Sequence, residues 1–153
     1  MKRYFKYSVT PTVGASSAYA SGDFVGEVME IKTGAADTMP ATLKTMTIID
    51  DAAQGSALNV IFFSQEPTIA SADNAALNLT DANMAYYIGH VAVAAGNYVA
   101  SASNAAACVK DINLHGLTSS DENGTIYAVI ESAGTPTYAA TDDLKFTFTF
   151  DLD

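Results

Sequence analysis

The chain has 153 residues, a length that most simply forms one domain over residues 1–153 and buries enough surface to fold without a disulfide or metal. Its 17 acidic and 7 basic residues give a net charge of −10, which disfavours nucleic acid as a partner because phosphates would be repelled. The single cysteine excludes an intrachain disulfide, and no run of roughly 18 apolar residues is present to cross a membrane.

Short stretches rich in β-branched and aromatic residues, separated by clusters of Gly, Ser, Asn, Asp and Pro, recur along the whole sequence. They predict about eight strands and little helix, which favours an all-β fold, an antiparallel β-sandwich of the jelly-roll type with one short helix. The expected strands cover residues 4–10, 23–32, 43–50, 57–63, 90–94, 108–114, 125–131 and 144–152.

The N-terminus carries most of the positive charge. Lys2, Arg3 and Lys6 are three of the seven basic residues, and they flank or begin the first expected strand. Such a cluster on an acidic chain suits docking on an acidic surface. A solvated terminus beside a strand is the simpler interpretation, and both remain open at this point.

The segment 57–93 is the most informative stretch. Residues 57–63 form an almost unbroken apolar run, typical of a strand buried on both faces, and Pro67 ends it. Thr80 or Asp81 can cap a short helix over residues 81–88. Gly89 then suits a left-handed helix stop, after which the next strand starts at His90.

Two later segments, 94–107 and 131–143, are expected to be long exposed loops. Each carries a tyrosine, Tyr98 and Tyr138, that would be able to stack on a sugar ring. Cys108 is expected to be a small buried side chain in a strand. The dipeptide at 123–124, Asn-Gly, predicts a hairpin that pairs residues 113–118 with residues 125–131.

The last strand has the clearest pattern of all. Leu144, Phe146, Phe148, Phe150 and Leu152 alternate with polar residues over nine positions, so one face should lie on the core and the other in water.

Motifs for chemistry are scarce. Two histidines and one cysteine do not make a standard zinc site, and no phosphate-binding glycine loop or nucleophile elbow occurs. The acidic pairs at 50–51 and 142–143 lack the spacing of a calcium loop, although a calcium site in a loop is not excluded. We therefore expect a protein that is not an enzyme and needs no metal or cofactor.

The segment 57–93 also carries a resemblance. FFSQEPT at 62–68, the loop at 73–77, and YYIGHVAV at 86–93 resemble small virion proteins of tailed bacteriophages, and the pattern extends over roughly residues 20–95. The resemblance implies a capsid decoration or cement protein that binds the outer surface of the major capsid protein shell and self-associates, for example as a homotrimer.

The same resemblance implies a virion location after synthesis in the host cytoplasm, and the N-terminus lacks the apolar region expected of a signal peptide. The alternative from the residues themselves is a tail- or fibre-associated binding module, an adhesin or a carbohydrate-binding β-sandwich, with Tyr98 and Tyr138 in recognition. The scarcity of charge, 16% of residues, suits either form of protein-protein contact.

Overall fold

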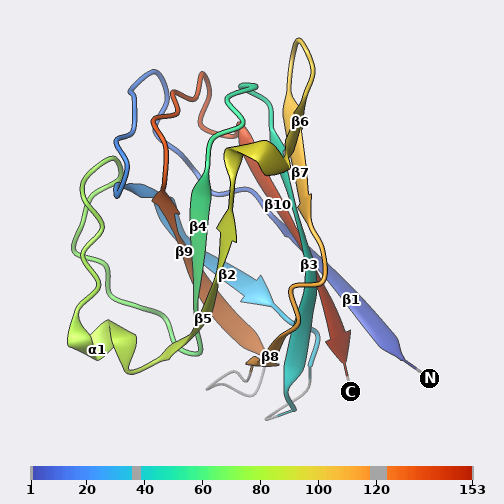
Figure 1. Ribbon diagram of the computed structural model, residues 1–153. Coiled ribbons are helices and arrows are strands. Elements are labelled where there is room, and N and C mark those ends of the chain that lie inside the picture. The colour runs from blue at the N-terminus through green and yellow to red at the C-terminus, as the bar shows by residue number, and fades with distance from the viewer. Residues whose placement is uncertain (1, 36–38, 118–123, 153) are drawn as a thin grey trace.

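The computed structural model describes residues 2–35, 39–117 and 124–152. Two antiparallel sheets pack face to face, with a short helix beside the smaller sheet (Figure 1). The elements are β1 (Arg3–Val9), β2 (Phe24–Lys32), β3 (Ala41–Asp50), β4 (Leu58–Phe63), α1 (Asp81–Met84), β5 (Tyr87–Val93), the 3-10 turn η1 (Ala95–Asn97), β6 (Tyr98–Ala100), β7 (Ala105–Val109), β8 (Leu114–Leu117), β9 (Thr125–Ser132) and β10 (Leu144–Leu152).

The connections define a jelly roll. The larger sheet has the order β1-β10-β3-β7-β6, with β8 also paired to β3, and the smaller sheet has the order β2-β9-β4-β5. The chain therefore crosses between the sheets at most connections, and the last strand returns to lie between β1 and β3. Two sheets woven in this way are the double Greek key of jelly rolls. The expected all-β, jelly-roll-like sandwich is confirmed.

A ladder of phenylalanines on β10 fills the space between the sheets. Phe146, Phe148 and Phe150 are fully buried, and their rings follow one another at centroid distances of 6.0 and 6.5 Å. Phe148 also meets Phe62 of β4 edge to face at 6.0 Å, which ties the two sheets together. The threonines that alternate with these rings are half-buried on the outer side. The predicted alternation is therefore confirmed from Leu144 to Phe150, whereas Asp151, expected in water, is buried.

The smaller sheet is covered on its outer face too. Phe63 and Val129 form a second apolar cluster there with Phe24, and residues of the segment 64–80 pack over it. Backbone hydrogen bonds hold this segment, from Phe24 N to Ala75 O and from Leu77 N to Gly22 O, at 2.8 and 2.9 Å. The expectation that residues 57–63 are buried on both faces is correct for this end of β4.

The helix is shorter than expected and β5 begins earlier. Thr80 caps α1 by accepting a hydrogen bond from Asn83 N, as predicted, but the helix ends at Met84. Gly89 is not a helix stop: it lies inside β5, on the core side. A Cβ there would come within 2.6 Å of Leu114 Cδ1, so a larger residue would force the Leu114 side chain to move, whereas the backbone conformation itself does not call for glycine.

Three predictions in the C-terminal half are wrong. Residues 94–107 are not an exposed loop but contain η1, β6 and most of β7. The expected strand 108–114 is two strands, β7 and β8, separated by a turn with left-handed Asp111 and Asn113. The expected hairpin does not form, because β8 pairs with β3 while β9 pairs with β2 and β4. Asn123 lies outside the described residues.

These errors share one cause. Long-range packing decides which strands pair. A turn dipeptide such as Asn-Gly only favours pairing between the two strands that flank it in sequence. One shorter correction follows the same logic: β3 begins two residues earlier than expected, because Ala41 pairs with Leu152 and Leu117.

The phenylalanine ladder predicts a large difference between neighbouring positions. Phe148→Ala should lower the free energy of unfolding by about 3–5 kcal/mol, because it opens a cavity between the sheets. Thr147→Ala, which loses only a half-exposed hydroxyl, should cost less than about 1 kcal/mol. Chemical denaturation of both variants measures this, and equal small losses would contradict the assigned core.

Candidate interaction surfaces

The first strand is an exposed edge of the larger sheet. β1 pairs with β10 along its whole length and, among the described residues, with no other strand. Lys2, Arg3 and Lys6 are all exposed. Strand alternation puts Lys6 and Tyr4 on the outer face, and Lys2 approaches Asp151 there at 3.8 Å, whereas Arg3 points to the opposite side. The structure thus brings together two of the three predicted cations.

The outer face of the larger sheet is rich in small hydroxyl side chains. Rows run straight across the strands: Ser8 lies opposite Thr147, which lies opposite Thr47, which lies opposite Cys108. A second row joins Lys6, Thr149 and Thr45. We call this surface the threonine face and define it by Tyr4, Lys6, Ser8, Thr45, Thr47, Cys108, Thr147 and Thr149.

Two contacts order the middle of the threonine face. Ser8 Oγ and Thr147 Oγ1 share a hydrogen bond of 2.9 Å, and Thr47 Oγ1 lies 3.7 Å from Cys108 Sγ. Cys108 is exposed, so its expected burial is wrong. The reason is register: Ala107 and Ala105 occupy the core positions of β7, which leaves position 108 on the outside.

Asp151 lies at the edge of the threonine face and is 6% exposed. Its Oδ2 faces the Lys2 ammonium, while its Oδ1 has no hydrogen-bond partner among the described residues. A buried carboxylate oxygen without a donor is costly, so this position favours a donor from outside the described chain.

The two tyrosines expected in exposed recognition loops are not available for that role. Tyr138 is 1% exposed, packs edge to face on Tyr19 at 5.8 Å, and belongs to the main core. Tyr98 is half-buried on β6 and also packs against the core. Burial raises the phenol pKa of both well above its usual range. Stacking of Tyr138 on a sugar is therefore excluded in this conformation, because its side chain points into the core while its neighbours Thr137 and Ala139 are exposed.

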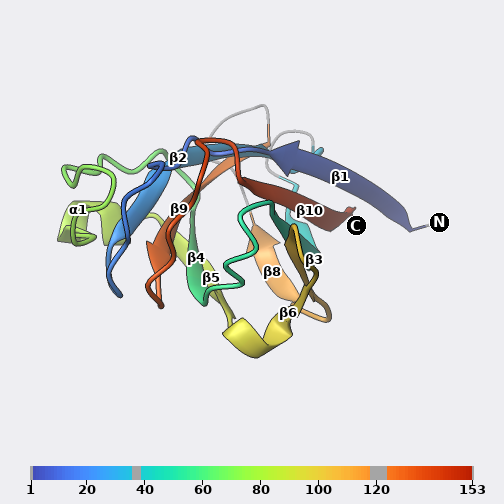
Figure 2. The same cartoon turned by 90° about the horizontal axis from the view of Figure 1, so that it is seen from above.

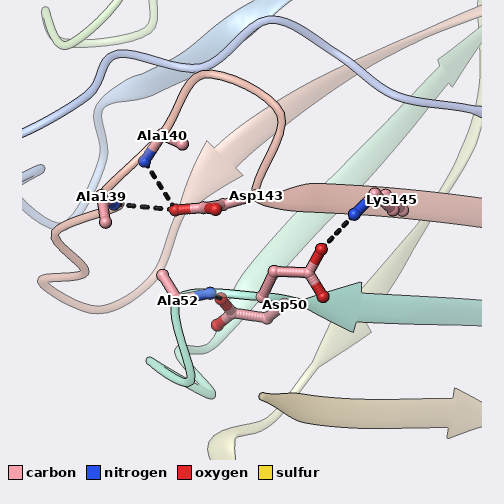
Figure 3. A network of polar contacts seen from close by, with 7 residues as sticks. Asp50, Ala52, Ala139, Ala140, Asp143 and Lys145 are labelled. Atoms are coloured by element: carbon pink, nitrogen blue, oxygen red, sulfur yellow. Dashed lines mark hydrogen bonds and ion pairs between the residues drawn. The ribbon is translucent and has the colours of Figure 1, made fainter. Parts of the chain in front are cut away.

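The acidic pairs anchor loops at one end of the sandwich (Figure 3). Asp50 accepts from Ala52 N and Gly55 N at 2.9 and 2.8 Å, and Asp143 accepts from Ala139 N and Ala140 N at 2.7 and 2.8 Å. Burial raises the pKa of Asp50, and the two N–H donors partly offset that effect. Asp51 forms an ion pair with Lys145. No group of three potential metal ligands occurs within the described ranges.

A recess on the smaller sheet escaped the sequence analysis. It has a volume of about 290 Å³ and lies on the outer face of β4 and β5, beside α1. The side chains around it are Asn59, Ile61, Leu79, Met84, Tyr87 and His90. No local sequence motif predicts this recess, because its side chains come from three separate segments. The aromatic pair at 86–87 is the one feature of the sequence that could have indicated it.

None of the helices in the described part of the chain is long and apolar enough to span a bilayer.

No family model and no curated protein matches this chain. Among solved structures, a chain of infectious bursal disease virus, Gx strain, is similar over 99% of this chain, with 12% identity and a TM-score of 0.43. This chain spans 32% of that one. A chain of turnip yellow mosaic virus is similar over 99% of this chain and 80% of its own length, with 11% identity and a TM-score of 0.36. Likenesses this distant do not decide what this chain binds.

Proposed function

We propose that this chain is a non-enzymatic structural protein of a virus particle, a decoration protein that binds in many copies to the outer surface of the major capsid protein shell. The observation that carries the proposal is the threonine face together with the exposed edge strand β1. This combination is a broad docking surface with little charge, bordered by two lysines.

The chemistry of the threonine face suits a tight contact between rigid bodies. Ser and Thr lose little rotamer freedom when immobilised, in contrast to Lys or Glu. Each hydroxyl both donates and accepts hydrogen bonds, so the surface adapts to backbone groups of a partner. Tyr4, 62% exposed on the same face, supplies a large amphipathic side chain of the kind enriched at interfaces.

Electrostatics favour an acidic partner for this end of the molecule. Lys2 and Lys6 border the threonine face, whereas the chain as a whole carries a net charge of −10. The remainder of a second copy is also acidic, so the same edge can serve contacts between neighbouring copies on a shell, including a homotrimer. Many weak contacts of this type become strong when all copies are held on one particle.

The sequence resemblance over residues 20–95 gives the proposal its viral context, and a jelly roll is an architecture that capsid proteins share with lectins and cupins. Because fold alone does not decide function, the tail- or fibre-associated binding module remains the second candidate. The observation in its favour is the recess beside Tyr87, since Tyr98 and Tyr138 no longer support it.

The deciding experiment is a quantified gel of purified particles from lysates that contain this protein. A decoration protein should appear in an amount comparable with the major capsid protein and should be removed without opening the head. A few copies per particle, co-purifying with tails, would favour the binding module, and absence from particles would reject both candidates.

If the protein docks through the threonine face, a large side chain at position 147 should prevent capsid binding. Thr147→Arg should abolish co-sedimentation with empty capsids, because a long cation in the middle of the contact blocks close approach and is left unpaired. The matched control is Thr68→Arg, an exposed position in the segment that packs beside α1. Both variants should remain folded by circular dichroism. Equal capsid binding by the two would place the docking surface elsewhere.

The basic end should set the rate and salt dependence of docking. Replacing Lys2, Arg3 and Lys6 with Ser should slow capsid association and flatten its dependence on salt, since such charges steer encounter more than they hold a complex. At about 0.15 M salt, charges beyond about 8 Å are screened, so the difference should be largest at low salt.

The control for this triple variant removes the same charge away from β1 and β10, with Lys32, Lys44 and Lys110 changed to Ser. Lys145 is kept, because strand alternation places it beside Thr147 on the outer face. Surface plasmon resonance on immobilised capsids measures both variants over a range of salt concentrations. Identical association rates for the two triple variants would mean that only net charge matters and that the N-terminus is a solvated end.

A further inference from the structure

The recess on the smaller sheet lies far from the proposed docking surface. It faces outward from β4 and β5, beside α1, whereas the N-terminal end of β1 extends from the opposite side of the molecule in both views (Figures 1 and 2). A copy that docks through β1 and the threonine face would leave this recess accessible. A ligand in this recess would deepen the second candidate function, the binding module, and its binding does not depend on docking through the threonine face.

A β-bulge places the central aromatic side chain of the recess. Phe62 lies opposite Gly89, but Phe63 lies opposite Tyr87, so Ile88 is the extra residue. Tyr87 and His90 are an odd number of residues apart and would face opposite sides of a regular strand. The bulge turns Tyr87 onto the outer face with His90. Bulges that re-aim one side chain are frequent next to functional sites.

The turned side chain is held in one orientation. The Tyr87 hydroxyl and His90 Nδ1 share a hydrogen bond of 2.6 Å, and the two rings lie 6.2 Å apart at 31°. Phe63 packs against the Tyr87 ring at 6.5 Å and 73°. Tyr87 is still 40% exposed, so part of this fixed aromatic side chain remains available at the recess.

The wall formed by the segment 64–86 is also fixed. Asn83, which is 5% exposed, accepts from Thr68 N and donates to Thr68 O, both at 3.1 Å. Thr80 caps α1, which positions Leu79 and Met84 on either side of it. The recess is therefore pre-organised, which lowers the entropy that binding would cost.

Two polar atoms of residues that line the recess, and one of the neighbouring Glu131, have no partner among the described residues. Asn59 lies opposite Glu131, and its Nδ2 donates to Glu131 Oε1 at 3.0 Å, which leaves Asn59 Oδ1 and Glu131 Oε2 unused. His90 Nε2 is the third, because only Nδ1 is engaged. In either neutral tautomer that nitrogen remains able to donate or accept.

These features select a class of ligand. The apolar side consists of Ile61, Leu79 and Met84, and the polar side offers Asn59 Oδ1 and His90 Nε2. Glu131 and the net charge of −10 disfavour anions. A pyranose ring has an apolar face of C–H groups and a rim of hydroxyls that can donate to such acceptors. We propose that the Tyr87 recess binds one ring of a neutral saccharide.

The test uses the full chain labelled with ¹⁵N and titrated with the methyl glycosides of glucose, galactose, mannose, rhamnose and N-acetylglucosamine. At least one should produce saturable amide shifts confined to β4, β5 and the segment 79–87, with a dissociation constant on the order of 1 mM for a single ring. Longer oligosaccharides of that sugar should bind more tightly. No saturable shift with any of the five would overturn the proposal.

Tyr86 provides a matched control, since it is 43% exposed and adjacent to Tyr87 but lines a different recess on the other side of α1. Tyr87→Ala should weaken binding by about tenfold or more, and Tyr86→Ala by no more than about twofold. Asn59→Leu, which keeps a similar size but removes the acceptor, is a second variant if Tyr87→Ala disturbs β5, and it should also weaken binding. Equal losses for both tyrosine variants, or unchanged binding in Tyr87→Ala and Asn59→Leu, would overturn the site.

Discussion

The arrangement of this protein depends on one strand that is apolar on one face and polar on the other. β10 lies between β1 and β3, and its phenylalanines reach across the sandwich to β4. Because side chains alternate along a strand, a shift of one residue would put the threonines inside and the rings outside. The same constraint that closes the core therefore also creates the threonine face. The proposed docking surface is the reverse side of the core strand.

The two outer faces of the sandwich differ in whether other parts of the chain cover them. The larger sheet has rows of Ser and Thr on its outer side, which need no cover. The smaller sheet has Phe63 and Val129 there, and these must be shielded from water. The segment 64–80 provides the shield, fixed by Asp73, which accepts from Tyr19 Oη and from Gly26 N at 2.6 Å. Where this cover ends, the recess begins.

The two sides of the molecule therefore differ. One side carries the basic N-terminus, and the recess lies on the opposite side. On a shell, such a molecule would present the recess to the surroundings of the particle. The two proposed roles would use opposite outer faces of the sandwich and therefore do not exclude each other. Tyr19 and Tyr138 are buried and Tyr98 is half-buried, so these tyrosines pack loops against the core. They contribute to docking only indirectly, through the stability of the fold.

Local pattern alone determined the strands that have a strict period of two, above all β10, and the cap of α1 at Thr80. It also determined the acidic, weakly charged character of the surface and the basic N-terminus. These features depend on neighbours in sequence, which the chain itself displays. The tertiary structure decided the rest: that β8 joins β3, that Tyr138 is in the core, that Cys108 is outside, and that a bulge brings Tyr87 beside His90. Each of these depends on contacts between residues far apart in the chain, where register and packing density select among pairings that local propensity leaves equal.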